Sequence, residues 1–278
     1  MPPVRVHVLG TAQDGGVPQS GCLCAHCEAA RKDPRRRRRI ACIAVEGATG
    51  KTFLVDATPD IRDQVDALRA GGGCRPSFVD ALALTHAHIG HYLGLAFLGK
   101  EALHAKDLPV YATPRMAKFV EQNRPWSHLV DRKEIELRTL VPGRPLSFDG
   151  AMIHAFLSPH RGEDTDTIGF EIHGATKRLV YVSDADVLPP AIVDRIMDAD
   201  VALVDGTFYS RPELPHRDIL EVKHPFVEES VKKLAGARGK VLFTHLNHTN
   251  PLLDPASAAT RALPAGFAVA EEGMVFEL

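Results

Sequence analysis

Three closely spaced histidines constrain the fold of this chain more than any other feature. The segment Leu82–Gly94 reads LALTHAHIGHYLG, and its apolar start leads into His86, His88 and His91. The apolar run predicts a buried strand, and a helix is expected over Tyr92–Leu103. A single histidine would more often be packed or solvated, but neutral imidazole is a ligand that zinc, iron, nickel and copper share. The spacing therefore predicts a metal site on a loop at the end of a strand.

Length and charge narrow the class of protein. With 278 residues, a formal charge of −2 and no break in composition, we expect a single domain over residues 1–278 with a large core and no nucleic-acid partner. Met1 leads almost directly into an alternating strand over Val4–Leu9, without a signal-like segment, and no apolar run approaches about 18 residues. We therefore expect a cytoplasmic protein without a membrane partner. A homodimer is the default for a soluble enzyme.

Cysteines predict a second metal site. Cys22, Cys24 and Cys27 form a C-x-C-x-x-C pattern, here called the cysteine knuckle, over residues 22–27. The odd total of five cysteines does not suit disulfides and points to a reducing compartment. Three thiolates need a fourth donor to close a tetrahedral zinc site, and His26 is too tightly placed between the cysteines, so we expect a distant histidine. The alternative is three free, buried thiols.

Further histidines and carboxylates follow other predicted strands. They are His160 after the β pattern over 134–156, Asp184 after Arg178–Val182, and His245 after Lys240–Phe243. The ends of strands are where α/β active sites collect. Asp56 also ends a strand and is either a support for the histidine loop or the cap of the following helix. Two β-rich halves, each with its own helices, predict an α/β fold built as a four-layer αββα sandwich.

Two other segments have open interpretations. The glycine-rich loop Gly10–Gln19 is either a structural turn or a phosphate cradle, and it lacks the G-K-[ST] ending of the phosphate loops. The five consecutive arginines Arg35–Arg39 form either a solvated segment or an anion site.

Taken together, the strand-end residues resemble a known family. His86, His88, His91, His160, Asp184 and His245, in this order, look like the metal-site series of the metallo-β-lactamase fold hydrolases. Within that family, Gly15–Gln19, Asp205–Phe208 and Thr249–Pro251 are similar to the pyrroloquinoline-quinone biosynthesis protein B group. The cysteine knuckle and the H-x-x-H ending in His248 resemble the phosphoribosyl cyclic phosphodiesterase of phosphonate breakdown. The second resemblance implies one structural zinc held by Cys22, Cys24, Cys27 and His248.

The resemblance also implies how the active-site cations are held. A first position would use His86, His88, His160 and Asp184, and a second would use His91, His245 and a bridging Asp184. The family's loop normally reads H-x-H-x-D-H, and this chain has Gly90 where the aspartate would ligate the second metal. We therefore expect one firmly held metal and a weaker or absent second one, unless Asp164, Asp166 or Asp186 substitutes. The quinone-biosynthesis group usually lacks the first two histidines, which this chain keeps.

These residues predict a metal-dependent hydrolase of a small-molecule ester or phosphodiester, including cyclic phosphates. A three-histidine site with an open position lowers the pKa of bound water from 15.7 to about 7, which supplies hydroxide at neutral pH. Asp184 would bridge the metals or orient the water, and His224 would act as a general acid unless it is a plain surface histidine. Zinc is expected in one or both positions, with iron or manganese as alternatives. The other hypotheses are a non-haem-iron oxidative enzyme and a non-catalytic binding homologue.

Overall fold

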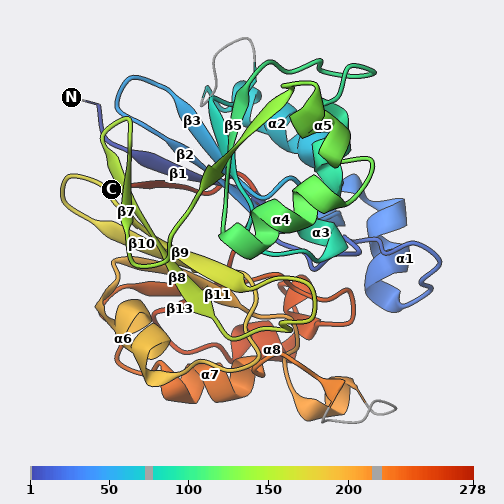
Figure 1. Cartoon of the computed structure of the whole chain (residues 1–278). Coiled ribbons are helices and arrows are strands. Elements are labelled where there is room, and N and C mark those ends of the chain that lie inside the picture. Colours follow the sequence, from blue (N-terminus) through green and yellow to red (C-terminus); the bar gives the residue numbers. More distant parts are fainter. Residues whose placement is uncertain (1, 73–77, 215–220) are drawn as a thin grey trace.

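Two β-sheets lie face to face with helices on their outer surfaces, as the computed structural model of the chain shows in Figure 1. The structure describes residues 2–72, 78–214 and 221–278. Within these residues, each sheet has seven strands. The expected four-layer αββα sandwich is therefore confirmed.

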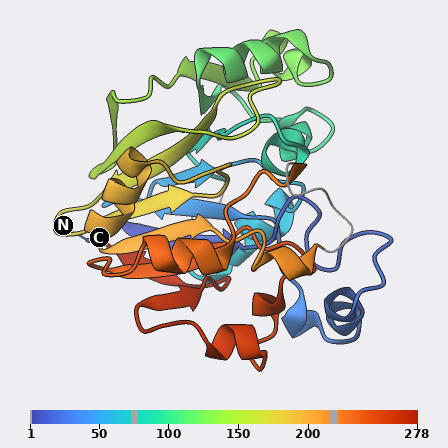
Figure 2. The same ribbon diagram turned by 90° about the horizontal axis from the view of Figure 1, so that it is seen from below.

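The first sheet is built mainly from the N-terminal half of the chain. In spatial order its strands are β14 (Val275–Glu277), β1 (Arg5–Gly10), β2 (Cys42–Glu46), β3 (Thr52–Val55), β4 (Ala81–Ala83), β5 (Leu108–Ala112) and β6 (Ile135–Thr139). Strands β3 to β6 are parallel, so their carboxyl ends meet at one edge of the sheet. The two ends of the chain lie together (Figure 2), where the Leu278 amide donates to the Val4 carbonyl at 2.9 Å.

The second sheet comes from the C-terminal half. In spatial order its strands are β13 (Phe267–Val269), β12 (Lys240–Thr244), β11 (Val201–Asp205), β10 (Arg178–Val182), β9 (Thr167–His173), β8 (Ala151–Ser158) and β7 (Pro145–Phe148). Strands β10 to β13 are parallel, and their carboxyl ends also share one edge. Loops from both sheets can therefore converge on one site.

A central apolar core fills the space between the sheets. Phe53 and Ile43 from the first sheet pack in one cluster with Phe170, Tyr181 and Leu203 from the second. Each is almost fully buried. Burial of a side chain of this size stabilises the fold by about 1.5–3 kcal/mol. This core fixes the two sheets relative to each other and with them the loops at their edges.

Helices cover the outer face of each sheet (Figure 1). The helices over the first sheet are α2 (Ile61–Ala70), α3 (Ile89–Tyr92), α4 (Pro114–Gln122) and α5 (Ser127–Asp131), and those over the second are α6 (Pro190–Asp198), α7 (Val227–Lys233) and α8 (Ala258–Arg261). Helix α1 (Ala25–Lys32) begins within the cysteine knuckle and contains Cys27. Single 3-10 turns span Pro34–Arg36, Arg211–Glu213 and Pro251–Leu253. Within the described residues, no helix is both long and apolar enough to cross a membrane.

The helix expected over Tyr92–Leu103 was wrong in kind. The structure has the short helix α3 and then a 3-10 segment over Leu93–Leu98. The amide of Gly94 donates to the carbonyl of Ala57 at 2.8 Å, and the amide of Ala57 donates to the carbonyl of His91 at 2.9 Å. These tertiary bonds replace the regular helical ones. A Cβ at Gly94 would also lie 2.1 Å from the Thr58 carbonyl oxygen, so the segment is pressed against this loop.

Candidate metal centre

Residues that follow strands of both sheets meet at one buried centre. The three histidines of the loop after β4 are joined by His160 after β8, Asp184 after β10 and His245 after β12. One ligand atom each from His86, His88, His160 and Asp184 lies within 4.8 Å of the others. The structure therefore brings together the four residues predicted for the first cation position.

A second group lies directly beside the first. Ligand atoms of Asp14, His91 and His245 lie within 4.8 Å of one another. The carboxylate of Asp184 faces both groups, because its Oδ2 lies 3.4 Å from His91 Nε2 while its Oδ1 lies 3.3 Å from His245 Nε2 and 3.7 Å from His160 Nε2. Asp184 is thus placed to serve both positions, as expected of a bridging carboxylate.

The buried atoms at this centre lack hydrogen-bond partners. They are the Nε2 atoms of His86, His91 and His245 and both carboxylate oxygens of Asp184. Buried polar atoms are nearly always paired, and an unpaired buried carboxylate is especially costly. The donor set, imidazole nitrogens around a carboxylate, suits zinc and other divalent transition metals. These residues therefore fit a metal ion.

Burial and neighbouring charges shift the pKa values of these same groups. Burial lowers the pKa values of His86, His88 and His245, which keeps these rings neutral with a lone pair available. Burial would also lower the pKa of His91, but the neighbouring carboxylates of Asp56 and Asp184 outweigh it and raise that pKa to about 10. Burial opposes ionisation of Asp184, yet the surrounding histidines hold its pKa well below the ordinary range. The centre thus offers neutral imidazoles around an ionised carboxylate, and His91 would release its proton when a cation binds.

Asp56 supports the histidine loop from behind. Its carboxylate accepts hydrogen bonds from Thr85 N at 2.8 Å and Thr85 Oγ1 at 2.9 Å, and it lies 2.7 Å from His91 Nδ1. These bonds direct His91 Nε2 toward the centre. The cap position of helix α2 is taken by Asp60 instead. Asp56 itself has a φ of 72°, a strained value for a non-glycine residue that a packed site can maintain.

A second supporting network was not anticipated from the sequence. Asp205 Oδ2 lies 2.7 Å from His224 Nδ1, and Asp205 Oδ1 accepts from Thr207 Oγ1 at 2.7 Å. The same hydroxyl lies 2.9 Å from His245 Nδ1. One carboxylate therefore orients two rings of the centre. Its place at the end of β11, like the other site residues on their strands, was the signal available in the sequence.

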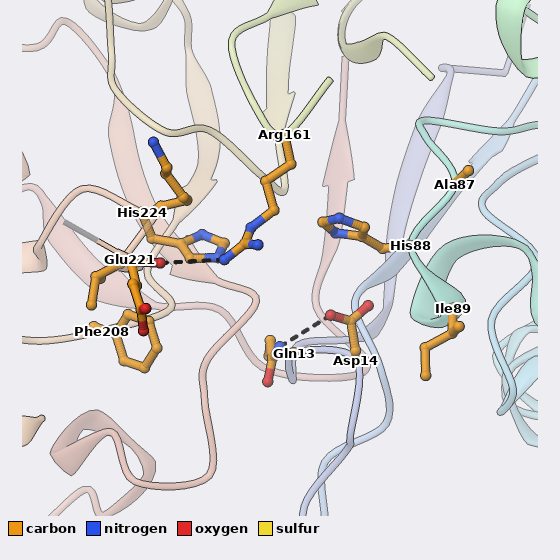
Figure 3. Close-up of a pocket in the computed structure, with 11 residues that line it drawn as sticks. Gln13, Asp14, Ala87, His88, Ile89, Arg161, Phe208, Glu221 and His224 are labelled. Carbon is orange, nitrogen blue, oxygen red and sulfur yellow. Dashed lines mark hydrogen bonds between the residues drawn. The ribbon is translucent and has the colours of Figure 1, made fainter. Parts of the chain in front are cut away.

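A cavity of about 320 Å³ adjoins the centre, and Figure 3 shows the side chains that line it. Asp14, His88 and His224 line it together with two cationic side chains, Arg161 and Lys223. The Arg161 guanidinium donates to the Glu221 carbonyl at 3.3 Å, a bond that joins two residues of the cavity wall. A ligand bound in this cavity would contact both candidate metal ligands and the cationic side chains of Arg161 and Lys223.

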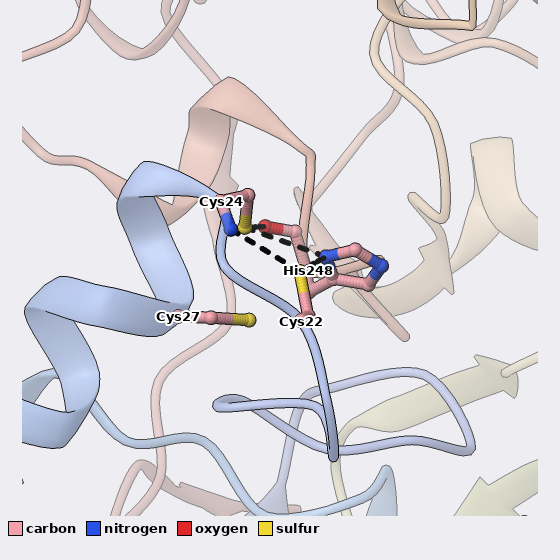
Figure 4. Close-up of side chains that lie close together, drawn as sticks. All are labelled: Cys22, Cys24, Cys27 and His248. Atoms are coloured by element: carbon pink, nitrogen blue, oxygen red, sulfur yellow. Dashed lines mark hydrogen bonds between the residues drawn. The ribbon is translucent and has the colours of Figure 1, made fainter.

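The distant histidine expected beside the cysteine knuckle is His248 (Figure 4). Ligand atoms of Cys22, Cys24, Cys27 and His248 lie within 4.8 Å of one another, with 3.2 Å between Cys22 Sγ and His248 Nδ1. His26 stays outside this group, because its Nδ1 bonds the carbonyl of His248 at 3.1 Å. Burial raises the pKa of the Cys27 thiol to about 12, so this thiol would release a proton on binding zinc. Three sulfurs and one imidazole nitrogen fit a closed, structural zinc site.

Comparison with known proteins agrees with this geometry. The model of the beta-lactamase superfamily domain matches residues 51–246. The chain belongs to the metallo-β-lactamase superfamily. Coenzyme PQQ synthesis protein B of Methylobacterium sp. (strain 4-46) is 32% identical over 98% of this chain and 99% of that protein.

Solved structures place the chain within this superfamily. The crystal structure of Zn(2+)-bound PqqB from Methylobacterium extorquens superposes with a TM-score of 0.87 at 27% identity, covering 99% of this chain and 100% of that one. A diphosphatase from the PhnP family superposes with a TM-score of 0.75 at 25% identity, covering 99% and 97%. Human tRNase Z, short form, has a TM-score of 0.63 at 15% identity over 98% of each chain, which shows the shared fold alone.

This member of the metallo-β-lactamase superfamily carries Gly90 in its histidine loop, and the expected substitutes do not fill the gap. Asp186 Oδ1 lies 2.9 Å from His160 Nδ1, on the far side of that ring from Asp184, and Asp166 accepts a hydrogen bond from Thr113. Neither these two nor Asp164 belongs to a ligand group among the described residues.

The arginine run is divided between two environments. Arg35 pairs with Asp33, and the guanidinium of Arg39 lies 2.6 Å from Glu272. Arg37, Arg38 and the ion-paired Arg39 also line a cavity of about 750 Å³ beside the glycine-rich loop. Part of the run is therefore engaged in ion pairs, and part faces a cavity next to the centre.

Proposed function

We propose that this chain is a metal-dependent hydrolase of anionic esters, with phosphodiesters as the first substrate class to test. The observation that carries the proposal is the group of unpartnered imidazole nitrogens and carboxylate oxygens beside a cavity. Its lining includes the cations Arg161 and Lys223 as well as the acidic residues Asp14 and Glu221. Members of the superfamily are usually hydrolases. Zinc is the cation we propose first, because the PqqB relative at 27% identity contains it.

The substrate would be held by the chain's own charges. When bound, the metal would supply a Lewis acid that lowers the pKa of a coordinated water to about 7. Arg161 and Lys223 line the cavity beside His88 and would bind the anionic oxygens of an ester. Asp184, which faces both ligand groups, would fix the geometry of the reacting groups.

His224 is the proposed general acid. Burial opposes protonation of its ring, but the carboxylate of Asp205 outweighs burial and raises the pKa of His224. The raised pKa keeps a proton on a ring that lines the cavity, where a leaving oxygen would accept it. Its fixed orientation by Asp205 supports this role over that of a plain surface histidine.

An apolar group on the substrate would have a place beside the centre. A neighbouring cavity of about 790 Å³ shares Arg161 and Lys223 and is lined by Leu157 and Val187. These two side chains are 59% and 56% exposed and supply apolar surface at the wall of this cavity. We propose that the substrate joins an anionic ester to an apolar portion.

A second candidate function is an oxidative step in the biosynthesis of a PQQ-like coenzyme. It is favoured by the 32% identity to Coenzyme PQQ synthesis protein B over nearly the whole chain. Histidine and carboxylate donors also suit non-haem iron. In this alternative the same centre would hold iron and use oxygen.

Metal content and turnover separate the candidates. Protein purified without oxygen is analysed for zinc, iron and manganese, then assayed with bis-p-nitrophenyl phosphate and, separately, for oxygen consumption. Zinc or manganese at the centre with phosphodiester hydrolysis supports the first proposal. Iron with oxygen consumption and no hydrolysis would overturn it in favour of the second. A centre without metal and without turnover, with zinc only at the knuckle, would leave a binding protein.

A further inference from the structure

We infer that Asp14 supplies the carboxylate ligand that the histidine loop has lost at Gly90, so that the centre keeps a complete second cation position. The inference depends on the metal site of the proposed function but not on the reaction. Asp14 lies in the glycine-rich loop after β1, far in sequence from every other residue of the centre.

The position of Asp14 supports this role. Asp14 Oδ1 lies 3.7 Å from His91 Nε2, and its ligand atom falls within 4.8 Å of those of both His91 and His245. The two histidine Nε2 atoms are buried and have no hydrogen-bond partner in the described structure. With Asp184 facing the same two nitrogens, a cation there would have two imidazoles and two carboxylates around it. This is a full tetrahedral set for zinc.

The space beside Gly90 also supports a ligand role for Asp14. A Cβ at Gly90 would lie 2.2 Å from Asp14 Oδ1 and 2.8 Å from Asp14 Cα. Gly90 does not have a positive φ, so its backbone does not require glycine. The absence of a side chain at 90 instead makes room for the carboxylate of Asp14. The amide of Gly90 even donates to Asp14 Oδ1 at 3.1 Å. The two positions are therefore mutually exclusive sources of one carboxylate.

Hydrogen bonds hold Asp14 and the segment before it in place. The Leu246 amide donates to the Thr11 carbonyl at 2.8 Å, and the Gln13 amide donates to the Leu246 carbonyl at 3.0 Å. These bonds tie the segment before Asp14 to the residue that follows His245. The side chain of Gln13 then donates to Asp14 Oδ2 at 3.0 Å. Such outer hydrogen bonds are typical of carboxylates that bind metals.

Zinc titration of four proteins tests the inference. The parent, Asp14→Asn, Gly90→Asp and the double variant Asp14→Gly/Gly90→Asp are stripped of metal and titrated with zinc. Bound zinc is counted by elemental analysis. We expect the parent to bind two zinc ions at the centre besides that of the knuckle. Asp14→Asn should weaken the second by at least about 10- to 100-fold, since even loss of a supporting group has this effect.

The double variant distinguishes a ligand from a merely structural residue. Gly90→Asp alone should bind poorly, because its Cβ would lie 2.2 Å from the Asp14 carboxylate. The double variant removes that carboxylate and keeps only the 2.8 Å approach to the Cα of residue 14, so it should regain the second zinc once the glycine-rich loop shifts. Asp166→Asn is the matched control and should bind like the parent. Manganese-loaded protein gives an independent measure, since paired ions produce a spin-coupled EPR signal that Asp14→Asn should lose.

Two results would overturn the inference: a parent with one zinc at the centre, or an Asp14→Asn variant with parental affinity for two. If such a variant binds two zinc ions but no longer hydrolyses the ester, Asp14 acts on the substrate instead. If the parent binds two zinc ions but hydrolyses no ester, the proposed function fails while the inference stands.

Discussion

The imidazole of His224 lies against the buried carboxylate of Asp205, with 2.7 Å between Nδ1 and Oδ2. This pairing leaves the ring lining the cavity in a fixed orientation. A histidine with only a surface role would have no need of a buried carboxylate behind it. The relationship therefore gives a direct test of the proposed proton donor.

Replacement of His224 by alanine should slow turnover without emptying the centre. We expect kcat to fall by about 100- to 10,000-fold, the usual contribution of a general acid, with a smaller change in KM. Steady-state kinetics with a phosphodiester measure this effect. Asp205→Asn should give part of the same loss because it misorients the ring. Loss of metal from His224→Ala would contradict the acid role and make His224 a ligand through its place beside Asp184 and His245.

The cysteine knuckle should contribute stability and not chemistry. Cys24→Ser should lose the structural zinc and lower the melting temperature, because zinc binding to such a site is part of the folding free energy. In a domain of this size each 1 kcal/mol lost lowers the melting temperature by about 2–4 °C. Cys42→Ala, which changes a buried cysteine outside the ligand group, is the control and should keep its zinc. A Cys24→Ser protein with full zinc content and parental melting would refute the zinc assignment.

Glu171 should make stability depend on acidity. Burial alone would raise the pKa of Glu171, but hydrogen bonds from His173 and Arg195 outweigh burial and lower it. The ionised form therefore stabilises the fold above the ordinary glutamate pKa of about 4.3, and this contribution disappears as the pH falls through the lower folded-state value. Glu171→Gln should cost roughly 1–3 kcal/mol at pH 7 and much less near pH 3.

Urea unfolding at the two pH values measures this difference. The control is Glu136→Gln, which breaks a pair with Arg138 in which Glu136 is 50% exposed, and it should cost less than about 1 kcal/mol. An equal loss in Glu171→Gln at both pH values would contradict the electrostatic explanation.

The sequence was informative at several strand ends, although it did not reveal the role of Asp205 at the end of β11. The ends of β8, β10 and β12 carry His160, Asp184 and His245, and strand periodicity alone placed each of them at an edge of a sheet. Parallel strands bring such ends together, so the centre was predictable before the structure. His248 was reachable only through resemblance, since nothing local links it to the cysteine knuckle.

Contacts between distant loops were the part that sequence could not supply. Asp14 sits 76 positions before Gly90, and only the folded chain shows that its carboxylate fills the space at that glycine. The absence of an aspartate at residue 90 indicated that another carboxylate was needed. Which residue supplies it depends on the fold, in particular on the hydrogen bond between Gln13 and Leu246. The same reason explains the wrong helix after His91, where tertiary bonds to Ala57 displaced regular helical ones.

Metal analysis of His88→Ala tests the convergence of these histidines on a cation most directly. His88 lies in the first ligand group and at the cavity wall, and it is only partly buried. We predict that the variant loses the metal of the first position and all hydrolytic activity, and keeps zinc at the knuckle and any ion held by Asp14, His91 and His245. It should melt within about 2 °C of the parent, a change of less than about 1 kcal/mol. His128→Ala, outside every ligand group of the described residues, should match the parent. A His88→Ala protein with unchanged metal content and activity would contradict the metal centre itself.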